Sequence, residues 1–118
     1  MGIYCMKIVS IVRKDEEKTI DYEWGKIIVF FESDNISMCY GIIRGKTPLH
    51  MHKKSHEYYY IIKGSSQITL GAKTHNVKPG DAISIPVETF HAIEKKSEEL
   101  EMCIITCPKY DPSDNYEK

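Results

Sequence analysis

The 118-residue sequence has no long apolar run and no excess of charge of either sign. No uninterrupted apolar segment approaches the roughly 20 residues that a membrane-spanning helix needs, so we expect no membrane partner. The 16 Lys and Arg residues nearly balance the 17 Asp and Glu residues. This balance argues against a protein that holds nucleic acid by bulk electrostatics. The start also lacks a basic segment followed by an apolar one, so we expect no secretory signal and a cytoplasmic location.

Closely spaced cysteine pairs are also missing. The four cysteines are Cys5, Cys39, Cys103 and Cys107, and no two of them form a Cys-x-x-Cys pair. A cytosolic chain would keep such thiols reduced. Because a free cysteine behaves as a small hydrophobe, we expect buried, chemically quiet thiols, with a metal or redox role as the alternative.

No helical period of apolar residues is sustained in the first 107 residues, and strand signals take its place. Short segments rich in Ile, Val, Phe and Tyr alternate with turns rich in Gly, Pro and charged residues. A chain of this length is most simply one domain. Many short strands at close spacing predict a sandwich or barrel, with strands expected at 4–13, 26–32, 36–44, 50–53, 57–63, 67–70, 74–77, 82–85, 90–94 and 100–106.

The last part of the chain differs in composition from the rest. Residues 108–118 are polar and contain two prolines. We expect residues 1–107 to form the barrel with its amino-terminal strands. The tail at 108–118 should be mobile or lie over the barrel surface.

Three histidines and one glutamate give the strongest functional signal. His50 and His52 stand two residues apart on an expected strand, so their side chains point to the same side of the sheet, about 6.5–7 Å apart along it. Glu57 and His91 would complete a set of nitrogen and oxygen ligands. Such groups inside an apolar barrel are costly unless a divalent cation pairs them. We therefore predict a metal centre; the alternative is that the histidines are independent surface or hydrogen-bonded residues.

The spacing of these residues resembles the first of two motifs that mark the cupin superfamily. That motif has a glycine, a His-x-His triplet, a glutamate and a second glycine. In this sequence it reads Gly45, His50-Met51-His52, Glu57 and Gly64. The one departure in spacing is four rather than five residues between Gly45 and His50.

The second motif also resembles its family counterpart, with two departures. It reads Gly80, then Pro86-Val87-Glu88, then His91. Glu88 stands where the family has a turn glycine, and Lys95 stands where it has an asparagine. Together the two motifs span about half of the chain.

This resemblance implies a fold, a ligand set and a cofactor. It implies an all-β protein, a single-domain double-stranded β-helix of the jelly-roll type. The family's metal ligands fall on His50, His52, Glu57 and His91. One divalent transition metal, which could be zinc, manganese, iron, nickel or cobalt, would suit these ligands.

Proteins that resemble this one perform different chemistry on the same four ligands, which leaves three functions open. The first is a metal-dependent isomerase, epimerase or lyase acting on a small sugar or carbonyl compound, with the metal as a Lewis acid. The second is a metal-dependent dioxygenase. The third is a non-catalytic module that binds or senses a small molecule. A dedicated regulator usually carries an attached effector domain, for which we expect no room here, and this favours an enzyme.

Proton transfer on such a substrate needs a base near the metal, and the candidates are Glu57, Tyr59 and Glu88. Tyr59 should look into the barrel beside Glu57, either as core filler or as a hydrogen-bond donor to substrate. Glu88 could contact substrate at the barrel mouth or face solvent. His56 should point to the face opposite Glu57, which favours a position behind the ligands or in solvent over a ligand role.

Residues 27–31 form a run that is apolar on both faces of an expected strand. Such a strand needs a cover beyond its own sheet. We therefore expect a homodimer in which the amino-terminal strands pack against or exchange with the partner. The alternative is a cover by loops or by the tail within one subunit. Tyr22 and Trp24 could edge the pocket or the subunit contact.

Overall fold

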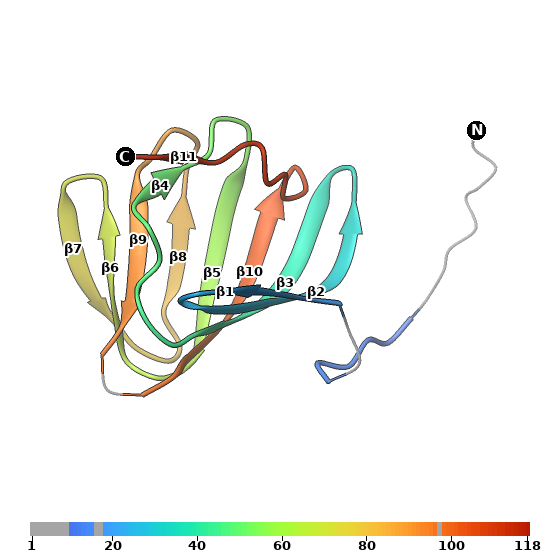
Figure 1. The fold of residues 1–118 in the computed structure, drawn as a ribbon, viewed down its shortest axis with the longest axis horizontal. Helices are drawn as coiled ribbons and strands as arrows, with labels where there is room; N and C mark the ends of the chain where they lie inside the picture. The colour runs from blue at the N-terminus through green and yellow to red at the C-terminus, as the bar shows by residue number, and fades with distance from the viewer. Residues whose placement is uncertain (1–9, 16–17, 97) are drawn as a thin grey trace.

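The structure is a computed structural model that describes residues 10–15, 18–96 and 98–118. These residues form strands in two antiparallel sheets, which face each other in Figure 1. The six-stranded sheet has the order β1-β2-β3-β10-β5-β8, and the five-stranded sheet has the order β11-β4-β9-β6-β7. The all-β jelly-roll prediction is confirmed. None of the described segments is a helix that could span a bilayer.

The bounds of the strands match most of the expected segments. The six-stranded sheet contains β1 (Lys18–Tyr22), β2 (Gly25–Ser33), β3 (Ile36–Ile43), β5 (His56–Lys63), β8 (Ala82–Ile85) and β10 (Leu100–Cys107). The five-stranded sheet contains β4 (His50–Met51), β6 (Ser66–Leu70), β7 (Lys73–Val77), β9 (His91–Lys95) and β11 (Tyr116–Glu117).

Strand β10 shows how the two sheets enclose a core. Its residues alternate between buried and partly exposed along its whole length. Because side chains of a strand alternate between faces, Leu100, Met102 and Ile104 all point inward. Strand β5 alternates in the same way, with Tyr59 and Ile61 inward. These side chains belong to one apolar cluster between the sheets, together with Cys39, Ile43, Ile68, Ile83, Ile85 and Ile93.

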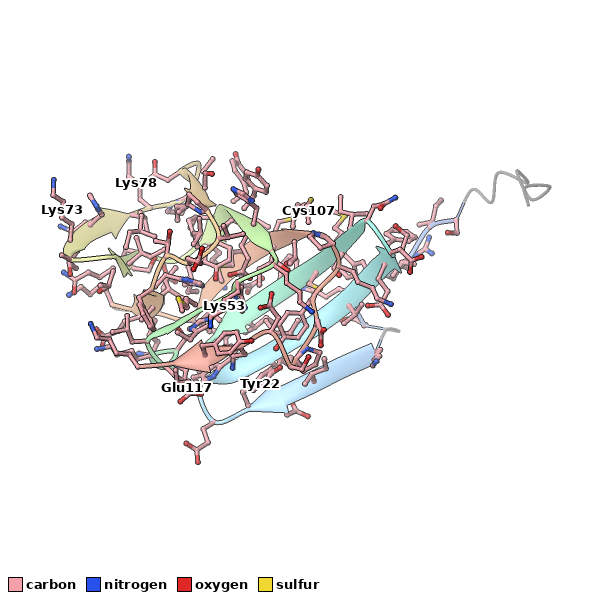
Figure 2. The ribbon with its side chains drawn as sticks, turned by 90° about the horizontal axis from the view of Figure 1, so that it is seen from above. Tyr22, Lys53, Lys73, Lys78, Cys107 and Glu117 are labelled. Carbon is pink, nitrogen blue, oxygen red and sulfur yellow. The ribbon has the colours of Figure 1, made fainter. Side chains whose placement is uncertain are left out.

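The first expected strand is wrong in its described part. Residues 10–13 are not in a strand, and residues 4–9 lie outside the described residues. Among the described residues the first strand is β1, an edge strand that pairs with β2. The sequence of β1 does not predict a strand, because Ile20 is its only aliphatic residue and most of its residues are exposed. In Figure 2, Tyr22 at the end of β1 and Glu117 of β11 lie on one side of the molecule, far from Lys73 and Lys78.

The C-terminal tail is part of the fold. Strand β11 pairs with β4, with Tyr116 opposite Met51 and Glu117 opposite His50. Figure 1 shows the two strands side by side near the C-terminus. Strand β4 ends at Met51 rather than at the expected Lys53, because the chain bends after His52. The tail therefore lies on the barrel, which is one of the two alternatives expected from the sequence.

The cysteines within the described part of the chain form no disulfide. Cys39 is buried, and Cys103 and Cys107 are half-buried. Burial raises the pKa of the Cys39 thiol to about 11, with a smaller contribution from the charge of Glu32. A thiol with such a pKa stays protonated at neutral pH and is a poor nucleophile. Cys5 lies outside the described residues.

Candidate metal centre

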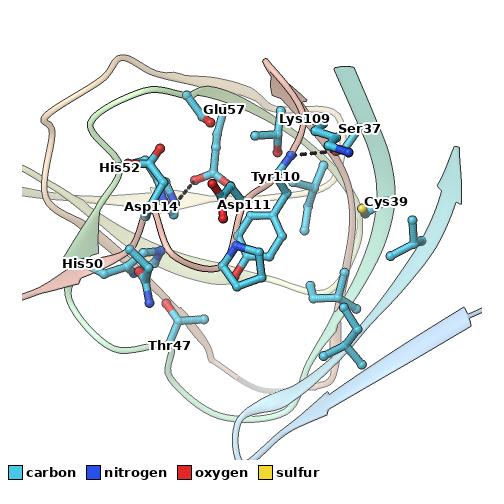
Figure 3. Close-up of a pocket in the computed structure, with 18 of the residues that line it drawn as sticks. Ser37, Cys39, Thr47, His50, His52, Glu57, Lys109, Tyr110, Asp111 and Asp114 are labelled. Carbon is cyan, nitrogen blue, oxygen red and sulfur yellow. Dashed lines mark hydrogen bonds and ion pairs between the residues drawn. The ribbon is translucent and has the colours of Figure 1, made fainter. Parts of the chain in front are cut away.

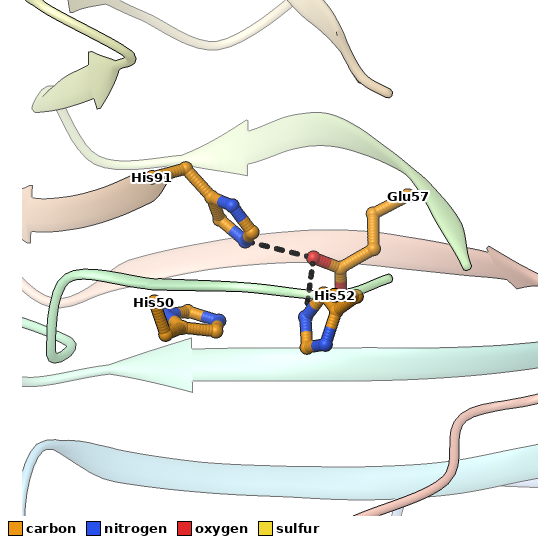
Figure 4. Close-up of side chains that lie close together, drawn as sticks. All are labelled: His50, His52, Glu57 and His91. Carbon is orange, nitrogen blue, oxygen red and sulfur yellow. Dashed lines mark hydrogen bonds and ion pairs between the residues drawn. The ribbon is translucent and has the colours of Figure 1, made fainter. Parts of the chain in front are cut away.

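The four predicted ligands come from both sheets and meet at one place. His50 lies on β4, directly opposite His91 at the start of β9. His52 follows β4, and Glu57 is the second residue of β5 in the other sheet. One potential ligand atom from each residue lies within 4.8 Å of those of the other three. Figure 4 shows the three rings gathered around the Glu57 carboxylate.

The two sheets bring the donors together deep in the molecule. Nε2 of His91 lies 2.9 Å from Oε1 of Glu57, and Nε2 of His52 lies 3.2 Å from the same oxygen. These three residues are buried, and His50 is partly exposed. Two buried imidazoles therefore face the same buried carboxylate oxygen.

Each of the three rings is held through its Nδ1 atom by a backbone carbonyl. The pairs are His50 with Pro48 at 2.7 Å, His52 with Asp114 at 2.6 Å and His91 with Thr89 at 2.9 Å. Because a carbonyl oxygen only accepts, each Nδ1 must carry the hydrogen. The second nitrogen, Nε2, is then the atom that each neutral ring can offer to a cation.

This arrangement fits a metal ion. A ring that already donates from Nδ1 can face a carboxylate through Nε2 only if Nε2 is protonated or if a cation lies between them. A divalent cation would replace the protons and satisfy both imidazoles and the carboxylate at once. Three imidazoles and one carboxylate suit a first-row transition metal rather than calcium or magnesium, whose ligands are oxygen atoms.

Burial and the close contacts between Glu57 and the histidines shift the pKa values of these residues. Burial alone would raise the pKa of Glu57, but the hydrogen bonds from His52 and His91 outweigh it and lower the pKa to about 2. Burial alone would lower the pKa of His52, but the bond to Glu57, the Glu57 charge and the Asp114 carbonyl raise it above its usual value. Burial, followed by the neighbouring His91, lowers the pKa of His50 to about 4. His50 is therefore neutral at pH 7 and ready to bind a cation.

A cavity of about 590 Å³ opens beside the centre, and His50, His52 and Glu57 line it. His91 lies behind them and does not line it. Figure 3 shows these three residues along one side of the cavity, with Cys39 on the other. Part of its wall is apolar and consists of Ile20, Ile27, Val29, Ile43, Met102 and Ile104. The cavity is thus a space between the sheets with a polar, cation-ready side and an apolar side.

Of the predicted catalytic residues, Tyr59 lies at the cavity and Glu88 does not. The Tyr59 side chain is buried, and its hydroxyl donates a long hydrogen bond of 3.4 Å to Oε1 of Glu57. Burial, then the Glu57 charge, raises the pKa of Tyr59 well above 10, so the phenol keeps its proton at neutral pH. Glu88 is exposed and lies outside the cavity lining. Its backbone N–H donates to the carbonyl oxygen of His52 at 2.7 Å.

The remaining sequence candidates fall on different sides of the six-stranded sheet. Tyr22 and Trp24 both line the cavity, and their rings stack with centroids 4.5 Å apart. This places the pair at the pocket. His56 is partly exposed on β5, one residue before Glu57, and its ring stacks on that of Tyr58. It is not part of the ligand group.

Sequence reasoning missed two residues of the tail, Tyr110 and Asp114. Both line the cavity. The Tyr110 ring meets that of His52 edge-on, with centroids 6.3 Å apart. Asp114 holds the His52 ring through its carbonyl oxygen. The only signal in the sequence is the turn-forming composition of residues 112–115, which predicts a turn but no contact with the centre.

Comparison with known sequences identifies relatives of the central segment. The sequence profile of the Cupin domain family matches residues 43–107, which include all four residues of the centre. An uncharacterized protein of Methanocaldococcus jannaschii is 46% identical over 52 residues, which are 44% of this chain and 42% of that protein. The match thus spans less than half the length of that relative.

Solved structures of low sequence identity share the fold. Streptomyces Pac13, a nucleoside dehydratase, has a TM-score of 0.82 at 13% identity, over 94% of this chain and 92% of that chain. KdgF from Halomonas sp. has a TM-score of 0.80 at 19% identity, over 88% of this chain and 99% of that chain. At such identities the likeness concerns the fold alone.

Proposed function

Because this chain belongs to the Cupin domain family, we propose that it is a metal-dependent isomerase, epimerase or lyase acting on a small sugar or carbonyl compound. One observation supports this most: three imidazoles, fixed in their Nδ1–H form by backbone carbonyls, converge with Glu57 beside a cavity. Such preorganised donors are what a catalytic metal needs, and the cavity gives room for a substrate.

His50, His52 and His91 would hold the metal through Nε2, and Glu57 would hold it through its carboxylate. Bound there, a divalent transition metal supplies Lewis-acid chemistry, polarising an oxygen of the substrate. Zinc, manganese, iron, nickel and cobalt all accept this mixture of nitrogen and oxygen ligands. A substrate that packs against the apolar side of the cavity would displace water and so strengthen the polar contacts made at the other side.

We propose that Tyr59 acts as a hydrogen-bond donor to the substrate. Its hydroxyl lies next to Glu57 and at the cavity, and it keeps its hydrogen at neutral pH. It can donate a hydrogen bond to a substrate oxygen on which charge develops. Glu57 is the nearest carboxylate, and its low pKa keeps it ionised and able to hold the metal. Glu88 has no part in this proposal, since it lies at the surface.

The cavity also restricts the substrate. The stacked rings of Tyr22 and Trp24 and the aliphatic side chains give one part of it an apolar surface, against which the faces of a sugar or another ring can pack. The oxygens of the substrate would point toward His50 and His52. Pac13, which shares the fold, is a nucleoside dehydratase, and a dehydratase is a lyase. This likeness supports only the capacity of the fold for such chemistry.

Hydrogen exchange in deuterated water tests the proposal whatever the identity of the product. The protein would be loaded with zinc, manganese, iron, nickel or cobalt in turn. Each form would be mixed with aldoses, ketoses, hydroxy-ketones and nucleosides. We expect deuterium at a carbon next to a carbonyl group, or loss of water, with at least one pairing. Tyr59→Phe should keep the metal and lose most of the exchange, and His91→Ala should lose both.

Two results would overturn the proposal. Oxygen consumption by an iron-loaded protein, with an oxidised product, would assign a dioxygenase. Full metal occupancy with ligand binding but no exchange or turnover across the panel would assign a binding or sensing module.

A further inference from the structure

The carboxyl-terminal residues 109–118, here called the C-terminal strap, cross from one sheet to the other over the metal centre. At its start, the backbone N–H of Tyr110 donates to Oγ of Ser37 on β3 at 2.8 Å. At its end, the N–H of Lys118 donates to the carbonyl oxygen of Leu49 at 3.1 Å, beside the pairing of β11 with β4. Lys53 also places its ammonium group 4.4 Å from the centre of the Tyr116 ring. The strap is thus fastened on both sides of the centre.

Asp114 is the point at which the strap touches the centre. It is 2% exposed, although the segment around it is polar and mostly exposed. Its carboxylate accepts hydrogen bonds from the backbone N–H groups of Lys53 at 2.8 Å and Lys54 at 3.0 Å, one on each oxygen. Its own carbonyl oxygen accepts the Nδ1–H of His52 at 2.6 Å. One residue therefore holds both the ring of His52 and the bend that follows it.

The bend is the connection between two of the four ligands. Residues 53–56 separate His52 from Glu57, and the two N–H groups that Asp114 binds are the first two in this stretch. A carboxylate that fixes two successive N–H groups restrains the path of the chain there. A shift of this bend would move the His52 ring relative to Glu57. Even a small displacement of a ligand weakens the binding of a metal.

We propose that Asp114 is a positioning residue of the metal centre, and that the C-terminal strap orients the His52 imidazole in its Nδ1–H form. This rests on the proposed metal centre but assigns a new role to a residue that ligates nothing. Loss of the outer partner of a ligating histidine typically weakens metal binding about 10- to 100-fold. We expect a loss in this range when the Asp114 carboxylate is removed, because the backbone carbonyl is then no longer held in place.

Metal affinity, measured by competition with a chromogenic chelator using zinc, tests this proposal. Asp114→Ala should bind zinc about 10- to 100-fold more weakly than the unaltered protein, and Asp114→Asn should lie between them because its amide oxygen keeps one of the two bonds. Asp111→Asn is the matched control. Among the described residues its carboxylate bonds only Ser113, which also belongs to the strap, so affinity should stay within about two-fold. Equal losses in both Asp→Asn variants, or none in either, would contradict the proposal.

A second measurement needs no metal. Nitrogen-15 spectra of the imidazoles in the metal-free protein show which nitrogens of His52 carry a hydrogen. Because Nδ1 faces the Asp114 carbonyl and Nε2 faces the Glu57 carboxylate, we expect a hydrogen on both nitrogens in the unaltered protein and in Asp111→Asn, and a fraction of rings without the Nδ1 hydrogen in Asp114→Asn. If Asp114→Ala does not fold, Asp114→Asn gives the answer for both measurements. If the unaltered protein binds no zinc, the metal centre is wrong, and an Nδ1 hydrogen on His52 that is fully kept in Asp114→Asn would then refute the positioning role separately.

Discussion

His50 and His91 face each other directly across β4 and β9, with ring centroids 4.2 Å apart. Both belong to the five-stranded sheet, whereas Glu57 lies on β5 of the six-stranded sheet. A cation bound by these residues would therefore link the two sheets to each other. Stability and metal binding should be coupled for this reason, since the unfolded chain offers no such set of ligands.

Replacing His91 by Ala should abolish tight metal binding and the stabilisation that comes with it. At free zinc 100 times above the dissociation constant, binding stabilises the native state by about 2.7 kcal/mol, which corresponds to a rise in Tm of roughly 10 °C. His91→Ala should show no such rise in a thermal melt with and without zinc. The same substitution at His75, exposed on β7, is the control and should leave the rise intact. Stoichiometric zinc in His91→Ala would show that the ligand assignment is wrong.

The metal-free protein should lose stability as the pH falls from about 6.5 to about 4. Burial and the neighbouring His91 lower the pKa of His50 to about 4, against 6.5 for an ordinary histidine. In this window the unfolded chain takes up a proton at residue 50 and the native state does not, so acid favours unfolding. The slope from one such group is at most about 1.4 kcal/mol per pH unit. Urea denaturation at pH 7 and pH 4.5 measures it.

The matched variant for this pH dependence is His50→Gln, which cannot titrate. Its stability should fall less than that of the unaltered protein between pH 7 and pH 4.5. Identical losses in the two proteins would assign the pH dependence to other groups. Above pH 6.5 both forms of the chain carry a neutral residue at position 50, so the two proteins should differ by a constant amount there.

Replacing Glu88 by Gly should stabilise the protein without changing its metal affinity. Glu88 is the one described residue other than glycine with a positive φ, at 58°. A side chain in this left-handed region costs roughly 1–2 kcal/mol, which a glycine avoids, although glycine also gains entropy in the unfolded chain. We expect a net gain of about 0.5–1 kcal/mol in the free energy of unfolding. Glu88→Ala keeps the strain, so it should show no gain in the same urea titration.

The outer face of the six-stranded sheet should bury itself against a second copy of the chain. Tyr58, Tyr60 and Ile62 alternate with the inward residues of β5 and are 44%, 51% and 43% exposed. Met38 on β3 and Phe31 on β2 are exposed as well. Such a continuous apolar area is unusual for a free surface. We expect a homodimer by light scattering.

A charge placed in this face should separate the subunits. Tyr60→Lys should give a monomer at concentrations at which the unaltered protein is a dimer, because an unpaired charge in an apolar interface is costly. Thr74→Lys on exposed β7 is the control and should leave the mass unchanged. A monomer of the unaltered protein at high micromolar concentration would count against the interface.

The spacing of residues in the two motifs was enough to predict the fold and the meeting of His50, His52, Glu57 and His91. Alternating apolar residues located most strands, since one face of each strand is buried. Strand β1 was not predicted, because it lies at an edge and most of its residues are exposed. The role of Asp114 was not predicted for a different reason. Its contacts run to backbone N–H groups and through its own carbonyl oxygen, and such contacts leave no pattern in the sequence.

The three imidazoles depend on oxygens that every amino acid possesses. Mutational drift at Pro48 or Thr89 can change the side chain and still leave an acceptor for Nδ1, provided that the path of the chain is kept. In centres whose imidazoles donate to carboxylate side chains, one substitution of that side chain removes the acceptor. The orientation of the His50 and His91 rings is thus set by the backbone, and the side chains at positions 48 and 89 can change while this orientation persists, whereas His52 also depends on the Asp114 carboxylate.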